Sequence, residues 1–373
     1  MKKSAVAIIA LLLVVSLTGC EKSFWPRGTD ITEFDIVRVI GFDKGDDDSV
    51  EVTVIAGRAQ EAPGEGFGAV SQIVASGTGK TALEAVSNLR SKLDKKQTFG
   101  NVDYILFGEG VLDDLKKYVD YPARNTEFRY SPKVFAVRGG SAKDFINEGS
   151  SESVILGDSL DNFRININSR SDIKGVRLID LMNMLYSDSV VILPALETVE
   201  QEGEKITEGE LPEKRINAAG YAVVYDPDFL EYLDTDVARG YNYLTNETRS
   251  CTYSISDGAG GYVGFDVKSA GLRIQPHFNG NQLIGATYSV TVNASVIERS
   301  IHLSETTLRH VTEQLEYAIK NETLSAIAKS KEFGVDCLGL YDKIKIRHPY
   351  KWRKNEGLIY ENLDIDAKVH VRI

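Results

Sequence analysis

The chain has 373 residues, of which 42% are hydrophobic and 26% are charged, and its formal net charge at pH 7 is −11. This apolar content is enough to build packed cores, so the composition excludes an intrinsically disordered protein. The acidic balance argues against nucleic acid as a partner, because phosphates attract basic proteins. At about 150 residues per domain, the length indicates two or three domains.

The first residues have the parts of an export signal. Lys2 and Lys3 precede an unbroken apolar run of eleven residues from Ala5 to Val15. A membrane-spanning helix needs about 20 apolar residues, so this run is too short to span and is typical of a signal peptide. We therefore predict that residues 1–19 are removed on export.

A cysteine follows the apolar run at the position of a lipid attachment site. The segment Leu17-Thr18-Gly19-Cys20 resembles the lipobox of bacterial lipoproteins. The resemblance implies that the Cys20 thiol receives a diacylglyceryl group and that the mature chain begins there. The alternative is a plain signal peptide with a chance cysteine.

A diacylglyceryl group brings two acyl chains, and two chains hold a protein firmly on a membrane whereas one holds it marginally. Residues 20–29 include Pro26 and Gly28 and are predicted as the tether. Without residues 1–19 the chain has 41 basic and 54 acidic residues, a net charge of −13. Such a body is repelled by anionic lipids, so we expect Cys20 to be its one attachment to the membrane.

Residues 30–199 are predicted to form an N-terminal α/β domain, either as one unit or as two subdomains. Two segments rich in β-branched residues, 35–41 and 50–57, flank an acidic run from Asp43 to Asp48, which indicates a hairpin. A calcium loop is the alternative, but Gly45 comes too early for its spacing. Further strands are expected at 102–107 and 134–137, and apolar residues at helical spacing predict helices within 80–93, 111–119 and 178–185.

Residues 200–215 are predicted as an inter-domain linker. Six of these sixteen residues are glutamate, and Gly203, Gly209 and Pro212 interrupt any regular element. The alternative is a solvated loop inside one domain. If the segment is a linker, limited proteolysis should cut there first and leave a folded C-terminal fragment.

Residues 216–373 are predicted to form an α+β domain, an antiparallel sheet packed with one long helix. Apolar and polar residues alternate over 288–296 and 363–373, which is typical of strands with one wet face. Asn279-Gly280 indicates a hairpin turn. An apolar stripe predicts a helix over 304–329, with Ser304 as its N-cap. The chain as a whole is therefore expected to be a multi-domain α+β (mixed α/β) protein.

No catalytic or metal-binding pattern stands out. The segment from Gly77 to Thr81 resembles the end of a phosphate-binding loop, but Val74 stands where that loop requires glycine, so a turn entering a helix is the better interpretation. The zinc-binding and nucleophile-elbow patterns are missing. We expect no enzyme activity, no metal and no cofactor. Cys251 and Cys337 are compatible with a disulfide or with two free thiols.

Two charged segments are candidate partner surfaces. The first is Arg347–Lys354, a basic and aromatic stretch that holds Tyr350, Trp352 and Arg353. Aromatic and arginine side chains dominate interface hot spots; the alternative is a loop in which Trp352 is buried for packing.

The second candidate surface consists of Arg124, Glu127 and Arg129. Alternating charges near a strand more often fix a loop than perform chemistry. We therefore expect a local charged network there rather than a catalytic centre.

Six further segments follow one another along the chain: Ile36–Lys44, Gly79–Leu93, Ile105–Glu109, Arg124–Arg129, Leu178–Leu196 and Ala219–Val223. In this order they resemble the Ger(x)C family, the lipoprotein C subunits of spore nutrient germinant receptors. Asn125 departs from the aspartate that the family has in the fourth segment.

The resemblance implies a non-enzymatic subunit on the outer face of the spore inner membrane, with an integral A subunit and a transporter-like B subunit as partners. The main competing hypothesis is a solute-binding lipoprotein of a membrane importer, which requires two lobes around a pocket lined by aromatic and polar groups. An exported hydrolase is a third hypothesis, and it lacks a recognisable nucleophile or metal site.

Overall fold

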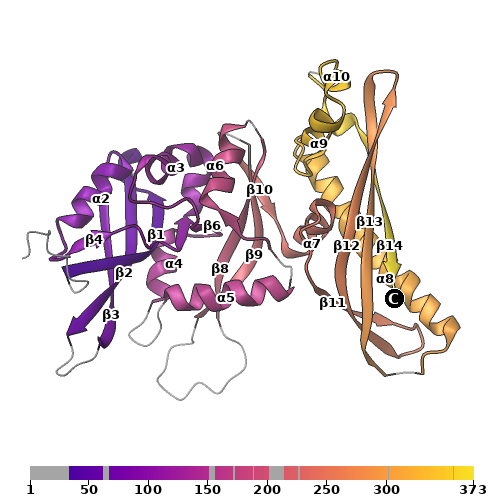
Figure 1. The fold of residues 1–373 in the computed structure, drawn as a ribbon, viewed down its shortest axis with the longest axis horizontal. Helices are drawn as coiled ribbons and strands as arrows, with labels where there is room; N and C mark the ends of the chain where they lie inside the picture. Colours follow the sequence, from indigo (N-terminus) through magenta and orange to yellow (C-terminus); the bar gives the residue numbers. More distant parts are fainter. Residues whose placement is uncertain are drawn as a thin grey trace, which may run out of the picture.

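A computed structural model describes residues 33–61, 67–150, 156–170, 173–187, 189–200, 214–225, 227–300, 302–355 and 357–373. The chain forms two units, each built on one β-sheet (Figure 1). The first unit spans residues 34–233, and the second spans residues 235–373. The expected mixture of helices and sheets, with one long helix on the C-terminal sheet, is confirmed.

The first unit is a ten-stranded mixed sheet with the order β10-β9-β8-β6-β5-β1-β2-β3, in which β4 pairs with β1 and β7 with β6. Its central strands β1, β5, β6 and β8 are parallel. The strands are β1 (Phe34–Lys44), β2 (Val50–Glu61), β3 (Phe67–Gly79), β4 (Lys96–Thr98), β5 (Tyr104–Phe107), β6 (Lys133–Val137), β7 (Val176–Arg177), β8 (Val191–Glu200), β9 (Lys214–Tyr225) and β10 (Asp228–Leu233).

Helices cover both faces of this sheet (Figure 1). One face packs against α2 (Ala82–Arg90), α3 (Leu115–Arg124) and α6 (Leu178–Tyr186), and the other against α4 (Ala142–Glu148) and α5 (Leu156–Arg170). All four residues of β5 are consequently buried, as expected for a strand covered on both sides. Short 3₁₀ turns lie at Asp46–Asp48 and Glu109–Asp114, the first of them in the predicted hairpin between β1 and β2.

Residues of the family-like segments meet at the start of α4. The buried Asp43 carboxylate accepts hydrogen bonds from the backbone N–H groups of Ala142 (2.7 Å) and Lys143 (2.9 Å). A Cβ atom at Gly108 would lie 2.0 Å from Asp43 Oδ1, so only glycine fits there. The Glu109 carboxylate accepts from the N–H of Gly139 and from the Tyr232 hydroxyl. These segments therefore hold α4 and β10 in place.

The segment 200–215 has a different role from the predicted one. Residues 201–213 lie outside the described residues, but the strands on either side of them, β8 and β9, pair antiparallel from Val191↔Val224 to Glu200↔Lys214. The chain thus returns to the first sheet, and the second sheet starts only at Cys251. The segment therefore connects two neighbouring strands of one sheet, as in the alternative of a loop inside one domain. The prediction of a linker failed because a glutamate-rich composition is compatible with either kind of connection.

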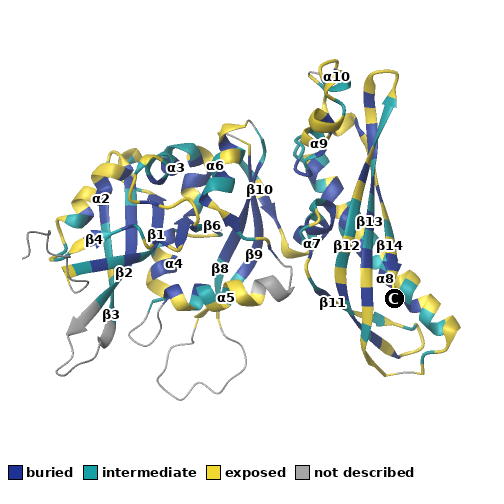
Figure 2. Cartoon of the chain, in the orientation of Figure 1, coloured by how far each residue is buried: buried dark blue, intermediate teal, exposed yellow. Residues whose placement is uncertain are grey.

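The second unit has a four-stranded sheet with the order β11-β12-β13-β14 and helix α8 across one face. Its elements are α7 (Thr235–Thr245), β11 (Cys251–Ser256), β12 (Tyr262–Asn279), β13 (Gln282–Arg299), α8 (Glu305–Glu332), α9 (Leu340–Arg347), α10 (Pro349–Trp352), a 3₁₀ turn (Tyr360–Asn362) and β14 (Asp364–Arg372). Burial alternates along β12–β14 (Figure 2).

In the second unit the predicted helix cap and hairpin turn are confirmed, whereas the predicted direction of the last strand is wrong. The Ser304 hydroxyl caps α8 by accepting from the N–H of Thr307 at 3.1 Å, and Gly280 has φ +61° in the β12–β13 turn. The prediction of an antiparallel sheet was wrong for β14, which pairs in parallel with β13. Helices α8 to α10 carry the chain back across the sheet before β14, and alternation along a strand does not encode its direction.

Buried contacts join the two units. Ala238 and Cys337 of the second unit belong to the same hydrophobic cluster as Tyr221 and Val223 of β9. The Tyr221 hydroxyl donates to Asn242 Oδ1 at 2.7 Å, and Lys329 pairs with Glu231. Cys251 and Cys337 are both buried and do not form a disulfide with each other. Burial raises the pKa of the Cys337 thiol to about 12.

Candidate functional site

The export signal, Leu17, Thr18, Gly19 and Cys20 lie outside the described residues, so the anchor stays a prediction. Within the described ranges, no three His, Cys, Asp or Glu side chains gather in a way that would hold a metal ion. In the acidic turn considered as a calcium loop, Asp48 instead pairs with Lys44 and Lys117. No helix in the described part of the chain has the length and apolarity needed to cross a membrane.

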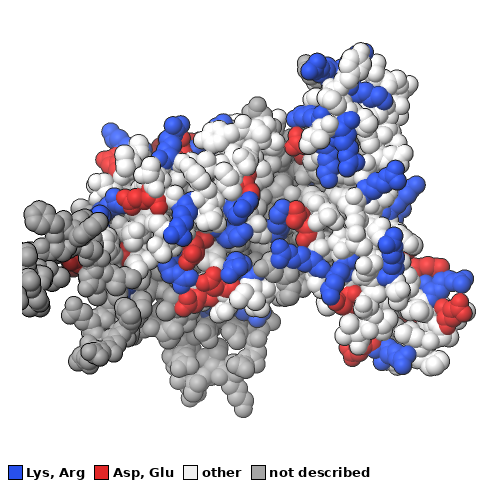
Figure 3. All heavy atoms as spheres, in the orientation of Figure 1, with Lys and Arg blue, Asp and Glu red and all other residues white. Residues whose placement is uncertain are grey.

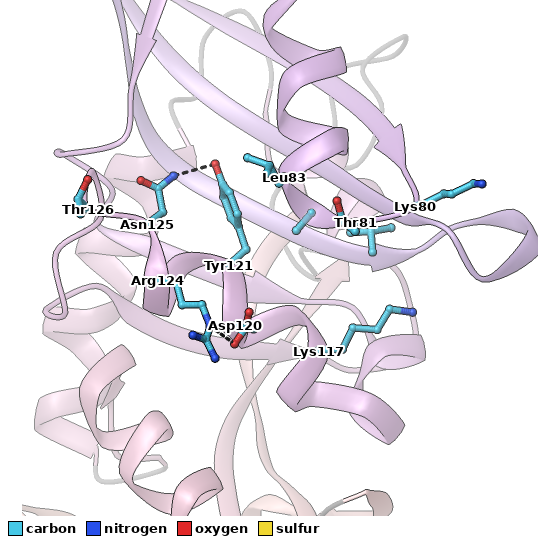
Figure 4. Close-up of a pocket in the computed structure, with 11 residues that line it drawn as sticks. Lys80, Thr81, Leu83, Lys117, Asp120, Tyr121, Arg124, Asn125 and Thr126 are labelled. Carbon is cyan, nitrogen blue, oxygen red and sulfur yellow. Dashed lines mark hydrogen bonds and ion pairs between the residues drawn. The ribbon is translucent and has the colours of Figure 1, made fainter.

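A pocket of about 580 Å³ lies between α2 and α3 (Figure 4). We call it the α2–α3 pocket. Its lining residues are Val50, Lys80, Thr81, Ala82, Leu83, Lys117, Asp120, Tyr121, Arg124, Asn125 and Thr126. It includes one of the three residues of the second candidate surface, Arg124.

The glycine-rich segment before α2 builds one wall of this pocket. The Thr81 hydroxyl accepts from the N–H of Glu84 (3.2 Å), and the Glu84 carboxylate accepts from the N–H of Lys80 (2.8 Å). This reciprocal pair caps the helix. A Cβ atom at Gly77 would lie 2.3 Å from the carbonyl oxygen of Ala85. The glycine therefore allows β3 to pack against α2. Residues 77–79 end β3 and residues 80–81 form the bend that enters α2, so the predicted turn is confirmed only for the last two residues of the segment.

The other wall comes from α3. Asn125 donates to the Tyr121 hydroxyl (2.9 Å), and Arg124 Nε donates to Asp120 Oδ1 (2.6 Å). Figure 4 shows Lys80 and Lys117 extending away from the pocket centre. Leu83 adds an exposed apolar side chain at the mouth. The pocket thus combines an apolar surface with a rim on which lysine and arginine outnumber aspartate, and it suits a segment carrying apolar and acidic side chains better than it suits catalysis.

The second candidate surface does not form the single network that we expected. Arg124 pairs with Asp120 four residues earlier, and Glu127 pairs with Arg90 of α2 at 3.0 Å. Arg129 is exposed and makes no ion pair within the described residues. The three residues are close in sequence, but Arg124 pairs within α3 whereas Glu127 pairs with α2.

A second pocket, of about 440 Å³, lies between the two units. Tyr225 lines it from the first unit, and Tyr241, Tyr341 and Tyr360 line it from the second. Asp336 also lines it and accepts from the N–H of Tyr341 at 2.6 Å. Burial raises the pKa of this carboxyl. No sequence signal marks this pocket, because its residues come from distant segments with no common spacing.

The first candidate surface, Arg347–Lys354, forms the end of the second unit at α9 and α10. Trp352 packs against Tyr341 with ring centroids 5.0 Å apart, and the Lys345 ammonium lies 5.2 Å from the Trp352 ring centre. Trp352 is only partly exposed and packs on the core, as in the packing alternative. Tyr350 and Arg353 are exposed and remain available for a partner.

Comparisons with known proteins match the chain over most of its length. A family model described as spore germination protein N-terminal domain matches residues 28–198, and one described as spore germination B3/GerAC-like, C-terminal, matches residues 219–373. Spore germination protein B3 of Bacillus subtilis (strain 168) is 21% identical to the chain, over 96% of this chain and 93% of that protein.

A solved structure has a similar fold. The crystal structure of the GerBC protein superposes with a TM-score of 0.55 at 16% identity, covering 90% of this chain and 96% of that one. Both family models match in the expected order and together span more than half of the sequence. The chain therefore belongs to the GerAC-like family of spore germination proteins, the C subunits of germinant receptors.

Proposed function

We propose that this protein is the lipid-anchored, non-enzymatic C subunit of a nutrient germinant receptor on the outer face of the spore inner membrane. The main observation in support of this function is that both family models match along the chain. The lipobox-like segment ending at Cys20 supports the anchor. No metal-binding cluster occurs among the described residues, and the α2–α3 pocket offers a binding surface rather than a nucleophile with its base.

The anchor explains how weak contacts suffice for assembly. Two acyl chains on Cys20 confine the protein to one membrane face. A short tether then gives the protein an effective concentration on the order of 1 mM toward integral A and B subunits in the same membrane. On this proposal, a segment of one of these subunits occupies the α2–α3 pocket, with its acidic groups near Arg124.

The test of the anchor is the Cys20→Ala variant. We expect it to leave the membrane fraction in a high-salt wash or to remain unprocessed. A processed variant that stays membrane-bound in high salt contradicts the lipid anchor.

The test of the receptor role is deletion of the gene. Spores should lose the response to the nutrients of the cognate receptor and contain less of the A and B subunits, while receptor-independent germination persists. A strain that answers every nutrient normally, and that expresses no related C subunit, would exclude the receptor role.

A solute-binding role is the second candidate, and the inter-unit pocket is the observation that favours it. Its tyrosines and Asp336 provide the aromatic and polar groups that small-molecule sites use. Titration calorimetry of the protein with germinant nutrients tests this role. Binding that is tighter than millimolar and is lost in the Tyr225→Ala variant would support it. No heat signal with any nutrient would leave assembly as the role.

A further inference from the structure

Helix α9 has one buried and one exposed face. Leu340 and Ile344 are buried in the second core, whereas Lys343, Ile346 and Arg347 point away from it. Ile346 is 80% exposed and Tyr350, four residues further on, is 70% exposed. Both lie in a segment rich in lysine and arginine, and exposed apolar side chains with such neighbours are candidates for an interaction surface. We call α9, α10 and the adjoining β12–β13 turn the basic tip.

The basic tip is fixed in shape. The buried Asn355 accepts from the N–H of Leu283 (2.8 Å) and donates to the carbonyl oxygens of Asn281 (2.7 Å) and Lys351 (2.8 Å). The Lys351 ammonium also lies 4.0 Å from the ring centre of Phe278 in β12. These contacts fix α10 and the residues after it on the β12–β13 hairpin. The exposed side chains of the basic tip therefore project from a well-packed backbone.

The charge of the basic tip is opposite to that of the rest of the chain. Residues 340–354 contain six basic residues and one acidic residue, in a protein whose net charge is −11. Figure 3 shows lysine and arginine gathered over the end of the second unit that carries α9 and α10. This end protrudes from the body in Figure 1. A convex basic end is complementary to an extended negative surface.

We propose that the basic tip docks on the headgroups of anionic lipids, with Ile346 and Tyr350 entering the interface between them. Interfacial segments combine lysine and arginine with apolar and aromatic side chains in this way. The hollow of about 420 Å³ described at the tip suits an acidic peptide less well, because Lys354 is the one cation in its lining of Asn281, Gln282, Lys354, Asn355, Gly357 and Leu358.

A lipid-binding tip would give the protein a second attachment to the membrane, beside the one expected at Cys20. Net charge averages over the whole surface, whereas screening confines each charge to about 10 Å at 0.1 M salt. A local cluster of cations therefore binds an anionic surface although the body is acidic. The inference is independent of the proposed function, because it needs neither the acyl chains nor other subunits.

The test uses the chain from residue 20 onward with Cys20→Ser, which keeps every described residue and prevents acylation. Flotation with vesicles of phosphatidylglycerol and of phosphatidylcholine measures its partition. We expect binding to the anionic vesicles alone, and release at 1 M salt. Three reversals at exposed cations of the tip should weaken binding about 100-fold, since each cation contributes roughly fivefold. They are Lys343→Glu, Arg347→Glu and Arg353→Glu.

A matched control variant distinguishes the loss of cations at the basic tip from the change in the protein's net charge. It consists of Arg299→Glu, Arg309→Glu and Arg372→Glu, which make the same change in charge at exposed positions outside the tip. The control should bind as the parent does. Replacing Ile346 and Tyr350 by serine should weaken binding about tenfold or more without changing charge. Circular dichroism checks the fold, and glutamine in place of glutamate gives a milder second variant.

The outcomes decide the matter. Parent protein that ignores anionic vesicles, or tip and control variants that lose binding alike, overturns the inference. Tip variants that keep full vesicle binding but no longer co-purify with the A and B subunits assign the surface to a protein partner instead. Loss in the tip variants alone, reduced in the glutamine series, supports the lipid surface.

Discussion

The two units bury their sheets in different ways. The central strands of the first unit are covered on both faces, so β5 is buried at every residue. In the second unit α8 covers one face, and β13 alternates between buried residues such as Val292 and exposed ones such as Asn293. A sheet between two helical layers has its free surface at helix ends and loops. A sheet covered on one side keeps a polar face and two protruding ends.

This difference accounts for where the candidate surfaces lie. In the first unit the α2–α3 pocket is found at the ends of two covering helices. In the second unit the basic tip lies at the end of the long hairpin β12–β13, beyond the sheet's core. The difference between the units also implies that α8, the long helix across one face of the second sheet, contributes a large part of the second core, to which α7 and α9 add smaller parts.

The largest effect is expected for Leu315→Ala in α8. Leu315 is fully buried against the second sheet, and removing a buried leucine side chain costs about 2–5 kcal/mol. The free energy of unfolding, from urea titration, measures the loss. Tyr317→Ala on the exposed side of the same helix is the control, and it should change stability by less than about 0.5 kcal/mol. Equal losses would show that α8 is not the support of this core.

The next effect concerns Asp43 in the first unit. Burial raises the pKa of the Asp43 carboxyl from its ordinary value of 3.8 to about 6, although the hydrogen bonds from the N–H groups of Ala142 and Lys143 lower it. Because the folded pKa is the higher one, the fold favours the protonated carboxyl. This contribution is present below pH 3.8 and is lost as pH rises through 6.

The Asp43→Asn variant cannot titrate at this position. Relative to the variant, the wild type should therefore be more stable at pH 4 than at pH 7, by at most ~3 kcal/mol. Urea titrations at both pH values measure the difference. Asp47→Asn in the exposed turn controls for the loss of one charge. Parallel profiles of wild type and Asp43→Asn would contradict the raised pKa.

A smaller effect is expected at the contact of α7 with α8. A Cβ atom at Gly240 would lie 2.0 Å from the carbonyl oxygen of Glu322, and helix backbone cannot give way as a side chain does. Gly240→Ala should destabilise the protein by about 1–3 kcal/mol, because overpacking outweighs the better helix propensity of alanine. Thermal unfolding measures it. At Gly271 a Cβ would meet nothing within 4 Å, so Gly271→Ala should be mild.

Local elements were predictable from the sequence, and arrangements between distant residues were not. Ser304 and an apolar stripe predicted α8, and alternation predicted β13, because both signals lie within a few residues. The parallel direction of β14 and the inter-unit pocket depend on residues far apart in the chain. Arg124 was found as a candidate, but its partner Asp120 and the pocket beside it follow from the packing of α2 on α3.

Arg124 should contribute to binding and not to folding. Its side chain is 77% exposed and its partner Asp120 is also exposed, and such ion pairs are screened by water and salt. Arg124→Glu should leave the melting temperature unchanged while lowering co-purification of the A and B subunits. Arg129→Glu, at an exposed residue outside the pocket, is the matched control. A drop in melting temperature would make Arg124 a structural residue.

The smallest effect is expected from a cut within residues 201–213, made by introducing the recognition sequence of a specific protease there. Strands β8 and β9 on either side pair over most of their length, and Ala222, Val223 and Val224 of β9 are buried in the first unit. The cut removes a connection but none of these contacts, so both fragments should elute together in size-exclusion chromatography at the volume of the uncut chain. If the segment instead joined two separate domains, β9 would belong to the C-terminal fragment's own core, and the fragments would separate on dilution.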